Sequence, residues 1–201
     1  MSLLVLVRHG QSTSNLANIF TGELNVNLTA QGEQEAHETA HKLRGFPFDV
    51  AFTSVLSRAE RTLAIVLHDL QLHTLPTHHN AALNERNYGD LQGLNKEETT
   101  QKYGTEQVNQ WRRSYAVSPP GGESLQQTQA RVLPYYTAAI APRLRQGQHV
   151  LVVAHGNSLR ALRMYLDQLS PQEVEHLEIP TGGACVYDLD PALNVLKLRI
   201  L

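Results

Sequence analysis

The chain has 201 residues, of which 41% are hydrophobic and 18% charged, and its formal net charge is −2. This length and composition are typical of a globular chain with a sizeable core, so we expect residues 1–201 to form a single domain. The lack of a basic run argues against nucleic-acid binding. No apolar stretch approaches the length of a signal peptide core or a membrane span, so we expect no membrane association and a cytoplasmic location.

The first half of the chain predicts strands that alternate with helices. Residues 3–7 (LLVLV) read as a short buried strand. Residues 29–45 predict an amphipathic helix that begins at Thr29, a suitable N-cap residue. Residues 48–54 predict a second strand, and its last residue, Ser54, is placed to cap the helix that follows.

The second half continues the same alternation. Residues 124–146 predict a helical region that Pro134 and Pro142 kink or divide. The strand predicted at 149–154 leads directly into another helix, and two more strands close the chain. This alternation predicts a mostly parallel sheet with helices on both faces.

Two of the predicted strands run directly into a His-Gly pair, in the segments LVLVRHG (4–10) and VLVVAHG (150–156). If these strands are parallel, His9 and His155 emerge at the same edge of the sheet, where ligands of such sheets bind. A helix follows the second pair at once, and its free N–H groups favour an anion there.

Cations and a carboxylate accompany the two histidines. Arg58 lies one turn into the helix after the second strand, where a cation opposes the helix dipole unless an anion binds. The segment ALNERNYGDLQGL supplies Glu85, and QWRR supplies Arg112 and Arg113. A neutral imidazole is a nucleophile toward phosphorus, guanidiniums neutralise phosphoryl oxygens, and a carboxylate can shuttle a proton. The set therefore favours phosphoryl transfer without a metal.

At these residues the sequence resembles the histidine phosphatase superfamily, whose mark is the RHG at residues 8–10. Within it, the chain resembles the 2,3-bisphosphoglycerate-dependent phosphoglycerate mutases over nearly its whole length. The blocks NERNYGDLQGLNK and QWRR are the most specific to mutases. Further similar segments are LVRHGQSTSN, FTGELNVNLT, TSVLSRAERT, KYG, AHGNSLRAL and IPTG. The resemblance implies a phosphoglycerate mutase-like fold, a three-layer α/β/α sandwich with a mostly parallel central sheet.

The resemblance also implies roles for the matching residues. His9 would be the phosphorylated nucleophile, Arg8, Arg58 and His155 would hold the transferring group, and Glu85 would be the general acid and base. The remaining residues of the substrate pocket would be Asn15, Thr21, Gly22, Arg86, Tyr88, Lys96, Arg112, Arg113, Gly156 and Asn157. The implied cofactor is 2,3-bisphosphoglycerate, which primes His9, and no metal is implied.

Three functions stay open at this point. The first is a mutase that interconverts 3-phosphoglycerate and 2-phosphoglycerate in glycolysis and gluconeogenesis. The second is a phosphatase of small phosphate esters that uses the same catalytic residues. The third, remote one is a zinc metalloprotease, because HETAH at residues 37–41 matches the H-E-x-x-H signature. No clear third zinc ligand accompanies His37 and His41, and both lie on a polar helix face.

Departures from the longer mutases bear on the choice between the first two functions. Where those mutases carry an insertion, this chain has only SPPGGES (118–124), and no C-terminal tail follows its last predicted strand. In relatives the tail helps to cover the active site, so we expect weaker shielding from water here. The balance of mutase over phosphatase activity and the oligomeric state are not predicted.

Overall fold

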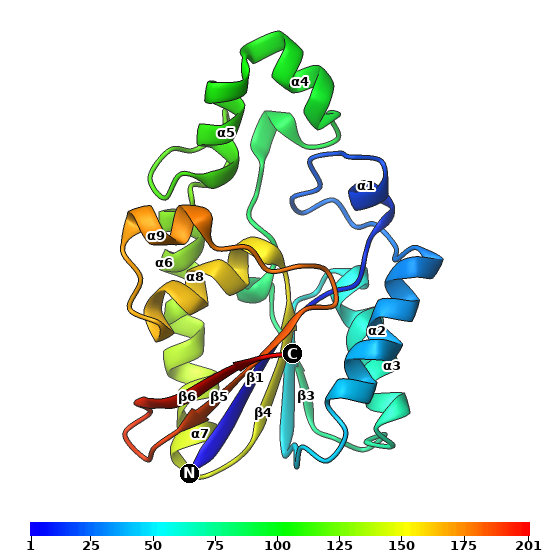
Figure 1. The fold of residues 1–201 in the computed structure, drawn as a ribbon, viewed down its shortest axis with the longest axis vertical. Coiled ribbons are helices and arrows are strands. Elements are labelled where there is room, and N and C mark those ends of the chain that lie inside the picture. The colour runs from blue at the N-terminus through cyan, green and yellow to red at the C-terminus, as the bar shows by residue number, and fades with distance from the viewer.

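A central sheet organises the computed structural model, which describes residues 1–201. The sheet has six strands in the order β3-β2-β4-β1-β5-β6 (Figure 1). The strands are β1 (Ser2–Arg8), β2 (Val50–Thr53), β3 (Thr77–His79), β4 (Val150–Ala154), β5 (Ala184–Leu189) and β6 (Val195–Ile200). Strands β1 to β4 are mutually parallel, whereas β5 pairs antiparallel with β1, and β6 antiparallel with β5. The mostly parallel sheet is confirmed.

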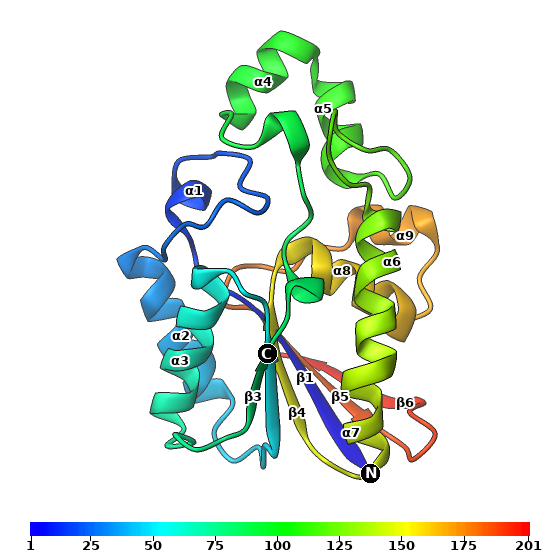
Figure 2. The same ribbon diagram turned by 180° about the vertical axis from the view of Figure 1, so that it is seen from behind.

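Helices cover both faces of this sheet, as the views from front and behind show (Figures 1 and 2). The helices are α1 (Thr13–Leu16), α2 (Ala30–Lys42), α3 (Ser57–Asp69), α4 (Lys96–Tyr103), α5 (Thr105–Arg113), α6 (Leu125–Tyr135), α7 (Ala141–Arg145), α8 (Gly156–Leu166) and α9 (Pro171–His176). Helices α2 and α3 pack on one face, and α6, α7 and α8 pack on the other. The three-layer α/β/α sandwich is therefore confirmed. None of the helices combines the length and apolarity needed to cross a membrane.

Strand β1 shows why the buried strands read as unbroken apolar runs. Leu4 and Leu6 belong to the core cluster on the α6–α8 side, and Val5 and Val7 belong to the cluster on the α2–α3 side. All four side chains are at most 1% exposed. Because both faces of the strand are covered, both sets of alternating positions must be apolar. Burial of each such side chain contributes about 1.5–3 kcal/mol to the free energy of folding.

Most local predictions hold, but one is wrong and one strand was not predicted. Helix α2 begins after Thr29, whose side chain accepts a hydrogen bond from the Gly32 N–H. Ser54, however, does not cap α3, which begins at Ser57 and has no side-chain cap. The structure also contains strand β3, which the sequence did not predict because its residues include the exposed, polar His78 and His79.

Helices α4 and α5 stand above the carboxyl ends of the parallel strands, at the top of Figure 1. They do not share the main core, because they pack on a separate small cluster. This cluster consists of Phe20, Leu91, Val108 and Trp111. Helices α4 and α5 therefore lie opposite the edge of the sheet where His9 and His155 emerge.

Candidate active site

The register of the sheet brings the two His-Gly pairs together. Arg8 and Ala154 are the last paired residues of β1 and β4, so the next residues, His9 and His155, leave the sheet side by side. Their ring centroids lie 4.9 Å apart. The predicted meeting of the two histidines at one sheet edge is confirmed.

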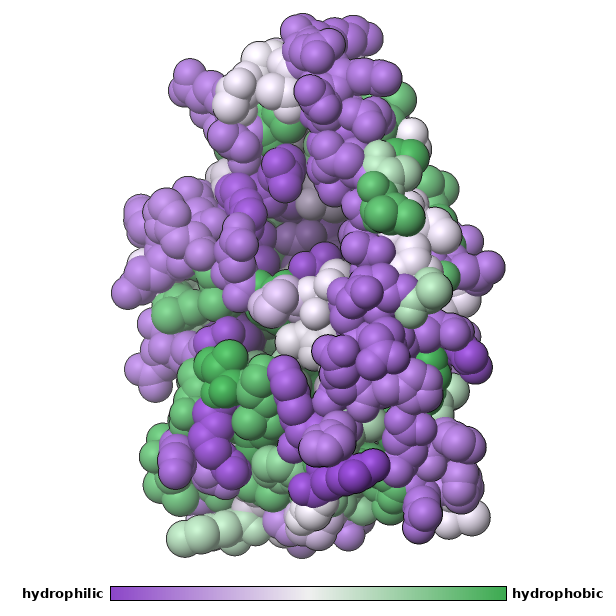
Figure 3. Space-filling view, turned by 45° about the vertical axis from the view of Figure 1, so that its right-hand side comes forward, coloured by the Kyte–Doolittle hydropathy of each residue, from purple (hydrophilic) through white to green (hydrophobic).

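A cavity of about 180 Å³ opens at this edge, and residues of α4 and α5 also line it. Figure 3 shows it as a hollow among hydrophilic residues. Its lining includes Arg8, His9, Asn15, Thr21, Gly22, Arg58, Glu85, Tyr88, Lys96, Arg112, Arg113, Gly156 and Asn157, all of which the sequence predicts for the pocket. Six cationic side chains face the cavity against two carboxylates, those of Glu85 and Glu178. This excess of positive charge favours a small ligand with several negative charges.

His9 is buried and is held in its neutral form. Its Nδ1 lies 2.7 Å from the Gly10 carbonyl oxygen. A carbonyl can only accept, so Nδ1 carries the proton and Nε2 keeps its lone pair, toward which Arg58 Nε donates over 3.3 Å. Burial, followed by the charges of Arg58 and Arg8, lowers the pKa of His9 well below its ordinary value. Nε2, with its free lone pair, is therefore the atom that can attack phosphorus.

Two arginines flank His9. Arg58 is 1% exposed, and its two terminal nitrogens donate to the Leu24 and Gly22 carbonyl oxygens, each over 2.8 Å. Burial lowers the pKa of Arg58 to about 10, so the side chain stays charged at neutral pH. Arg8 donates through Nη1 to the Ile179 carbonyl oxygen over 2.6 Å, and its buried Nε has no partner. An unpaired buried donor at this point suits a phosphoryl oxygen.

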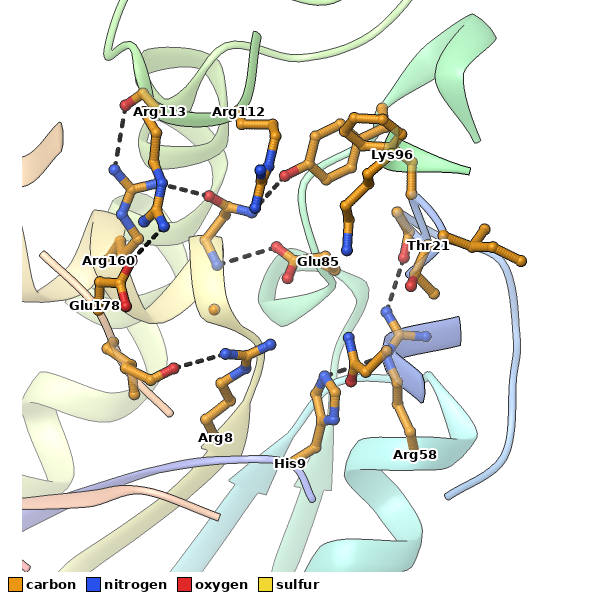
Figure 4. Close-up of a pocket in the computed structure, with 18 of the residues that line it drawn as sticks. Arg8, His9, Thr21, Arg58, Glu85, Lys96, Arg112, Arg113, Arg160 and Glu178 are labelled. Carbon is orange, nitrogen blue, oxygen red and sulfur yellow. Dashed lines mark hydrogen bonds and ion pairs between the residues drawn. The ribbon is translucent and has the colours of Figure 1, made fainter. Parts of the chain in front are cut away.

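Glu85 presents one free carboxylate oxygen to the cavity (Figure 4). Its Oε1 accepts hydrogen bonds from the backbone N–H groups of Arg86 and Asn157, over 2.8 and 3.0 Å. Asn157 lies in the first turn of α8, so the helix terminus fixes the carboxylate. A Cβ atom at Gly156 would lie 3.6 Å from both Glu85 Oε2 and Arg8 Nε, so glycine leaves that space open. The geometry lets Oε2 take up and release a proton.

Two of the predicted site residues do not line the cavity. Arg86 is fully buried behind Tyr88, and its Nη2 donates to the Tyr88 hydroxyl over 3.0 Å. The same nitrogen donates to the Arg112 carbonyl oxygen over 2.7 Å, at the end of α5. His155 is also fully buried and lies directly beside His9.

Comparison with known proteins agrees with this geometry. The model of the histidine phosphatase superfamily (branch 1) matches residues 4–199. This chain belongs to the histidine phosphatase superfamily. A protein of Cytophaga hutchinsonii named 2,3-bisphosphoglycerate-dependent phosphoglycerate mutase is 53% identical, over 97% of this chain and 91% of its own. A Bradyrhizobium sp. protein of the same name is 56% identical, over 93% and 91% of the two chains.

Two solved structures share the fold. Bacillus stearothermophilus YhfR aligns with a TM-score of 0.86 at 22% identity, over 100% of this chain and 96% of that one. A putative alpha-ribazole-5'-P phosphatase from Escherichia coli aligns with a TM-score of 0.81 at 28% identity, over 100% and 95%.

Arg160 and Glu178 also line the cavity, although they were not predicted from the sequence. Arg160 is 4% exposed and donates to Asn157 Oδ1 over 2.9 Å and to the Val174 and Arg113 carbonyl oxygens over 2.6 and 3.2 Å. Its signal in the sequence is an arginine between apolar residues of α8, in LRAL at residues 159–162. Glu178 forms an ion pair with Arg113.

The H-E-x-x-H motif lies on α2, away from this site. His37 Nδ1 is 2.6 Å from Asp69 Oδ2, and the His37 side chain is 49% exposed. No group of three or more His, Cys, Asp or Glu side chains is placed to hold a metal ion. His37 therefore belongs to a surface ion pair between α2 and α3.

The two buried histidines make the stability of this chain depend on pH. Burial lowers the pKa of His9 and His155 well below 6.5 in the folded chain, whereas both titrate near 6.5 when unfolded. Below about pH 6.5 the unfolded chain therefore binds protons that the folded chain does not. We expect the free energy of unfolding to fall from pH 6.5 to 5 by up to about 1.4 kcal/mol per pH unit for each histidine.

Urea unfolding at several pH values measures this dependence. A variant with both His9 and His155 replaced by asparagine should show a shallower slope between pH 5 and 6.5 than the natural chain. An unchanged slope would contradict the assignment of the pH dependence to these two residues.

Proposed function

We propose that this chain is a 2,3-bisphosphoglycerate-dependent phosphoglycerate mutase that acts as a single catalytic domain in the cytoplasm, in glycolysis and gluconeogenesis. It interconverts 3-phosphoglycerate and 2-phosphoglycerate through a phosphohistidine at His9. The observation that carries the proposal is the presence of cations at both ends of one small cavity. Arg8 and Arg58 lie beside His9, and Lys96, Arg112 and Arg113 lie on the far side, with Glu85 between the two groups (Figure 4).

In the first half of the reaction, phosphorylated His9 gives its group to the free hydroxyl of a monophosphoglycerate. The substrate oxygen forms a bond to phosphorus while the bond from phosphorus to Nε2 breaks, and the electron pair returns to Nε2. Glu85 Oε2 takes the proton of the attacking hydroxyl. Arg8 and Arg58 neutralise the charge on the transferring oxygens. The Gly10 carbonyl holds the proton on Nδ1 throughout.

In the second half the same residues act in reverse. The bisphosphoglycerate turns over in the cavity, and its other phosphate now faces His9. Nε2 attacks that phosphorus, and Glu85 returns the proton to the leaving oxygen. Primer 2,3-bisphosphoglycerate supplies the first phosphoryl group to His9.

The outer cations distinguish a mutase from a phosphatase. A bisphosphoglycerate carries two phosphates and a carboxylate, so its retention needs positive charge away from His9 as well as beside it. Lys96, Arg112 and Arg113 line this part of the cavity together, and burial, followed by the charge of Arg112, lowers the pKa of Lys96. Three neighbouring cations suit the distal anionic groups of the intermediate.

One assay tests the proposal. The purified protein is mixed with 3-phosphoglycerate and a trace of 2,3-bisphosphoglycerate, in EDTA and without added metal, and the products are separated. We expect 2-phosphoglycerate to exceed free phosphate. Free phosphate as the main product would instead identify a phosphatase, and a requirement for added zinc or magnesium would overturn the metal-free mechanism.

Arg112 and Arg113 should contribute unequally to binding. Arg112 Nε and its terminal nitrogens donate to no protein group, whereas the charge of Arg113 is already partly neutralised by its ion pair with Glu178. Loss of an arginine–phosphate contact costs about 1.5–3 kcal/mol, or roughly tenfold or more in affinity. We expect Arg112→Ala to weaken bisphosphoglycerate binding by that factor, and Arg113→Ala by less.

Calorimetric titration with 2,3-bisphosphoglycerate measures both effects. Hydrolysis of a small phosphate monoester that is too short to reach the far wall is the control, and it should change little in either variant. If the substitutions lowered mutase activity and this hydrolysis equally, the two arginines would act beside His9. That result would contradict their proposed role on the far side of the cavity.

A further inference from the structure

Ser54 lies in contact with the active-site histidine that does not become phosphorylated. It follows the last residue of β2 and is fully buried. Its Oγ lies 2.7 Å from His155 Nε2, and the same oxygen accepts a hydrogen bond from the Leu56 N–H over 3.2 Å. These are its only hydrogen-bond partners, so the hydroxyl that was expected to cap α3 is turned toward the site instead.

The partners of Ser54 determine the direction of its hydrogen bond to His155. The Leu56 N–H is a donor, so it offers no place for the hydroxyl proton. His155 Nε2 is the only acceptor within reach, and a buried hydroxyl proton without an acceptor is unfavourable. Ser54 therefore donates to Nε2, and the neutral ring of His155 must carry its proton on Nδ1.

His155 Nδ1 is buried and has no hydrogen-bond partner in the protein. Nearly all buried polar atoms are paired, so an unpaired one calls for a ligand or a water. The ring of His155 lies 4.9 Å from that of His9, beside the place where a phosphoryl group on His9 would be. Burial, followed by the charges of Arg58, His9 and Arg8, lowers the pKa of His155, so the ring holds a single proton and its position matters.

We propose that Ser54 is a positioning residue that fixes the tautomer of His155, so that Nδ1–H is the donor offered to the phosphoryl group on His9. The inference rests on the proposed transfer through His9. With the proton on Nε2 instead, the ring would present a lone pair to the phosphoryl oxygens and repel them. Ser54 thus acts on the reaction through His155 without touching the substrate.

Nuclear magnetic resonance of the full chain labelled with ¹⁵N-histidine tests the tautomer directly, because protonated and unprotonated ring nitrogens have well-separated shifts. A His155→Asn variant assigns the signals. We expect Nδ1–H in the natural chain, a mixture of tautomers in Ser54→Ala, and restoration of Nδ1–H in Ser54→Thr. The Nε2–H form in the natural chain would overturn the proposal, even if Ser54→Ala failed to fold.

Kinetics give the second measurement. Removal of one donor to transition-state charge costs about 10²–10³-fold, and Ser54→Ala still lets a fraction of the rings adopt the active tautomer. We therefore expect kcat to fall roughly tenfold to a hundredfold in Ser54→Ala, with a small change in KM and recovery in Ser54→Thr. If Ser54→Ala gave a mixture of tautomers but an unchanged kcat, the claim that the tautomer of His155 matters for turnover would be contradicted.

Thr53→Val is the matched control. Thr53 is the neighbouring residue on β2, is equally buried, and donates to the Val153 carbonyl oxygen without touching His155. Both the tautomer and kcat should be unchanged in this variant, so an equal loss there would assign the Ser54 effect to the fold. The tautomer readout needs no turnover, so failure of the mutase assay and failure of this inference are distinguishable.

Discussion

Replacement of His9 by alanine is expected to lower kcat by roughly 10⁴–10⁶-fold, because the variant lacks the atom that accepts the phosphoryl group. The neighbouring cations would remain, since Arg58 is fixed by the Gly22 and Leu24 carbonyls and Arg8 by that of Ile179. Binding of bisphosphoglycerate should therefore survive while turnover disappears. Single-turnover kinetics and calorimetry separate the two quantities.

A labelling experiment assigns the loss to the nucleophile. Incubation with phosphorus-labelled bisphosphoglycerate should give a label on the natural chain that is lost in acid and stable in base, as expected of phosphohistidine. His79→Ala, which removes a surface histidine paired with Glu60, should keep the label. Label that persisted in His9→Ala would show that another residue is phosphorylated.

Glu85→Gln is expected to lower kcat by about 10²–10⁴-fold, the usual contribution of a general acid and base. The amide oxygen of glutamine can still accept from the N–H groups of Arg86 and Asn157, so the shape of the cavity should be retained. What disappears is the exchange of a proton at the second oxygen. Steady-state rates and a thermal unfolding curve together measure this.

The second carboxylate of the cavity provides the comparison. Glu178→Gln leaves a side chain of the same size on the wall but lies beside Arg113, away from the reacting atoms. Its kcat should stay within a few-fold of the natural value. If Glu85→Gln also stayed within a few-fold while folding normally, a different group would be the proton carrier.

The inner half of the site could be predicted from the sequence because it follows from strand ends. An apolar run that stops at Arg8 and another that stops at Ala154 are visible in the sequence, and parallel pairing then places His9 beside His155. The core of α2 was also predictable, since a period of 3.6 residues shows which side chains face inward.

The remaining residues depend on contacts between distant segments. Ser54 precedes a helix and so resembles a cap, but the hydroxyl faces a histidine 101 residues away. Arg86 looks like a pocket residue because it neighbours Glu85, yet the backbone turns its side chain behind Tyr88. Such orientations follow from packing, which local sequence patterns do not encode.

The anchoring of the last turn of α5 has a consequence for protein engineering. The buried side chains of Arg86 and Arg160 donate hydrogen bonds to the carbonyl oxygens of Arg112 and Arg113. These bonds fix the main chain, so the side chains of residues 112 and 113 are not needed to hold it. Exchange of residues 112 and 113 should therefore alter which distal groups are accepted while the backbone stays in place. Positions 112 and 113 are therefore suited to the redesign of substrate specificity, whereas substitution of Arg86 or Arg160 would displace the main chain at the end of α5.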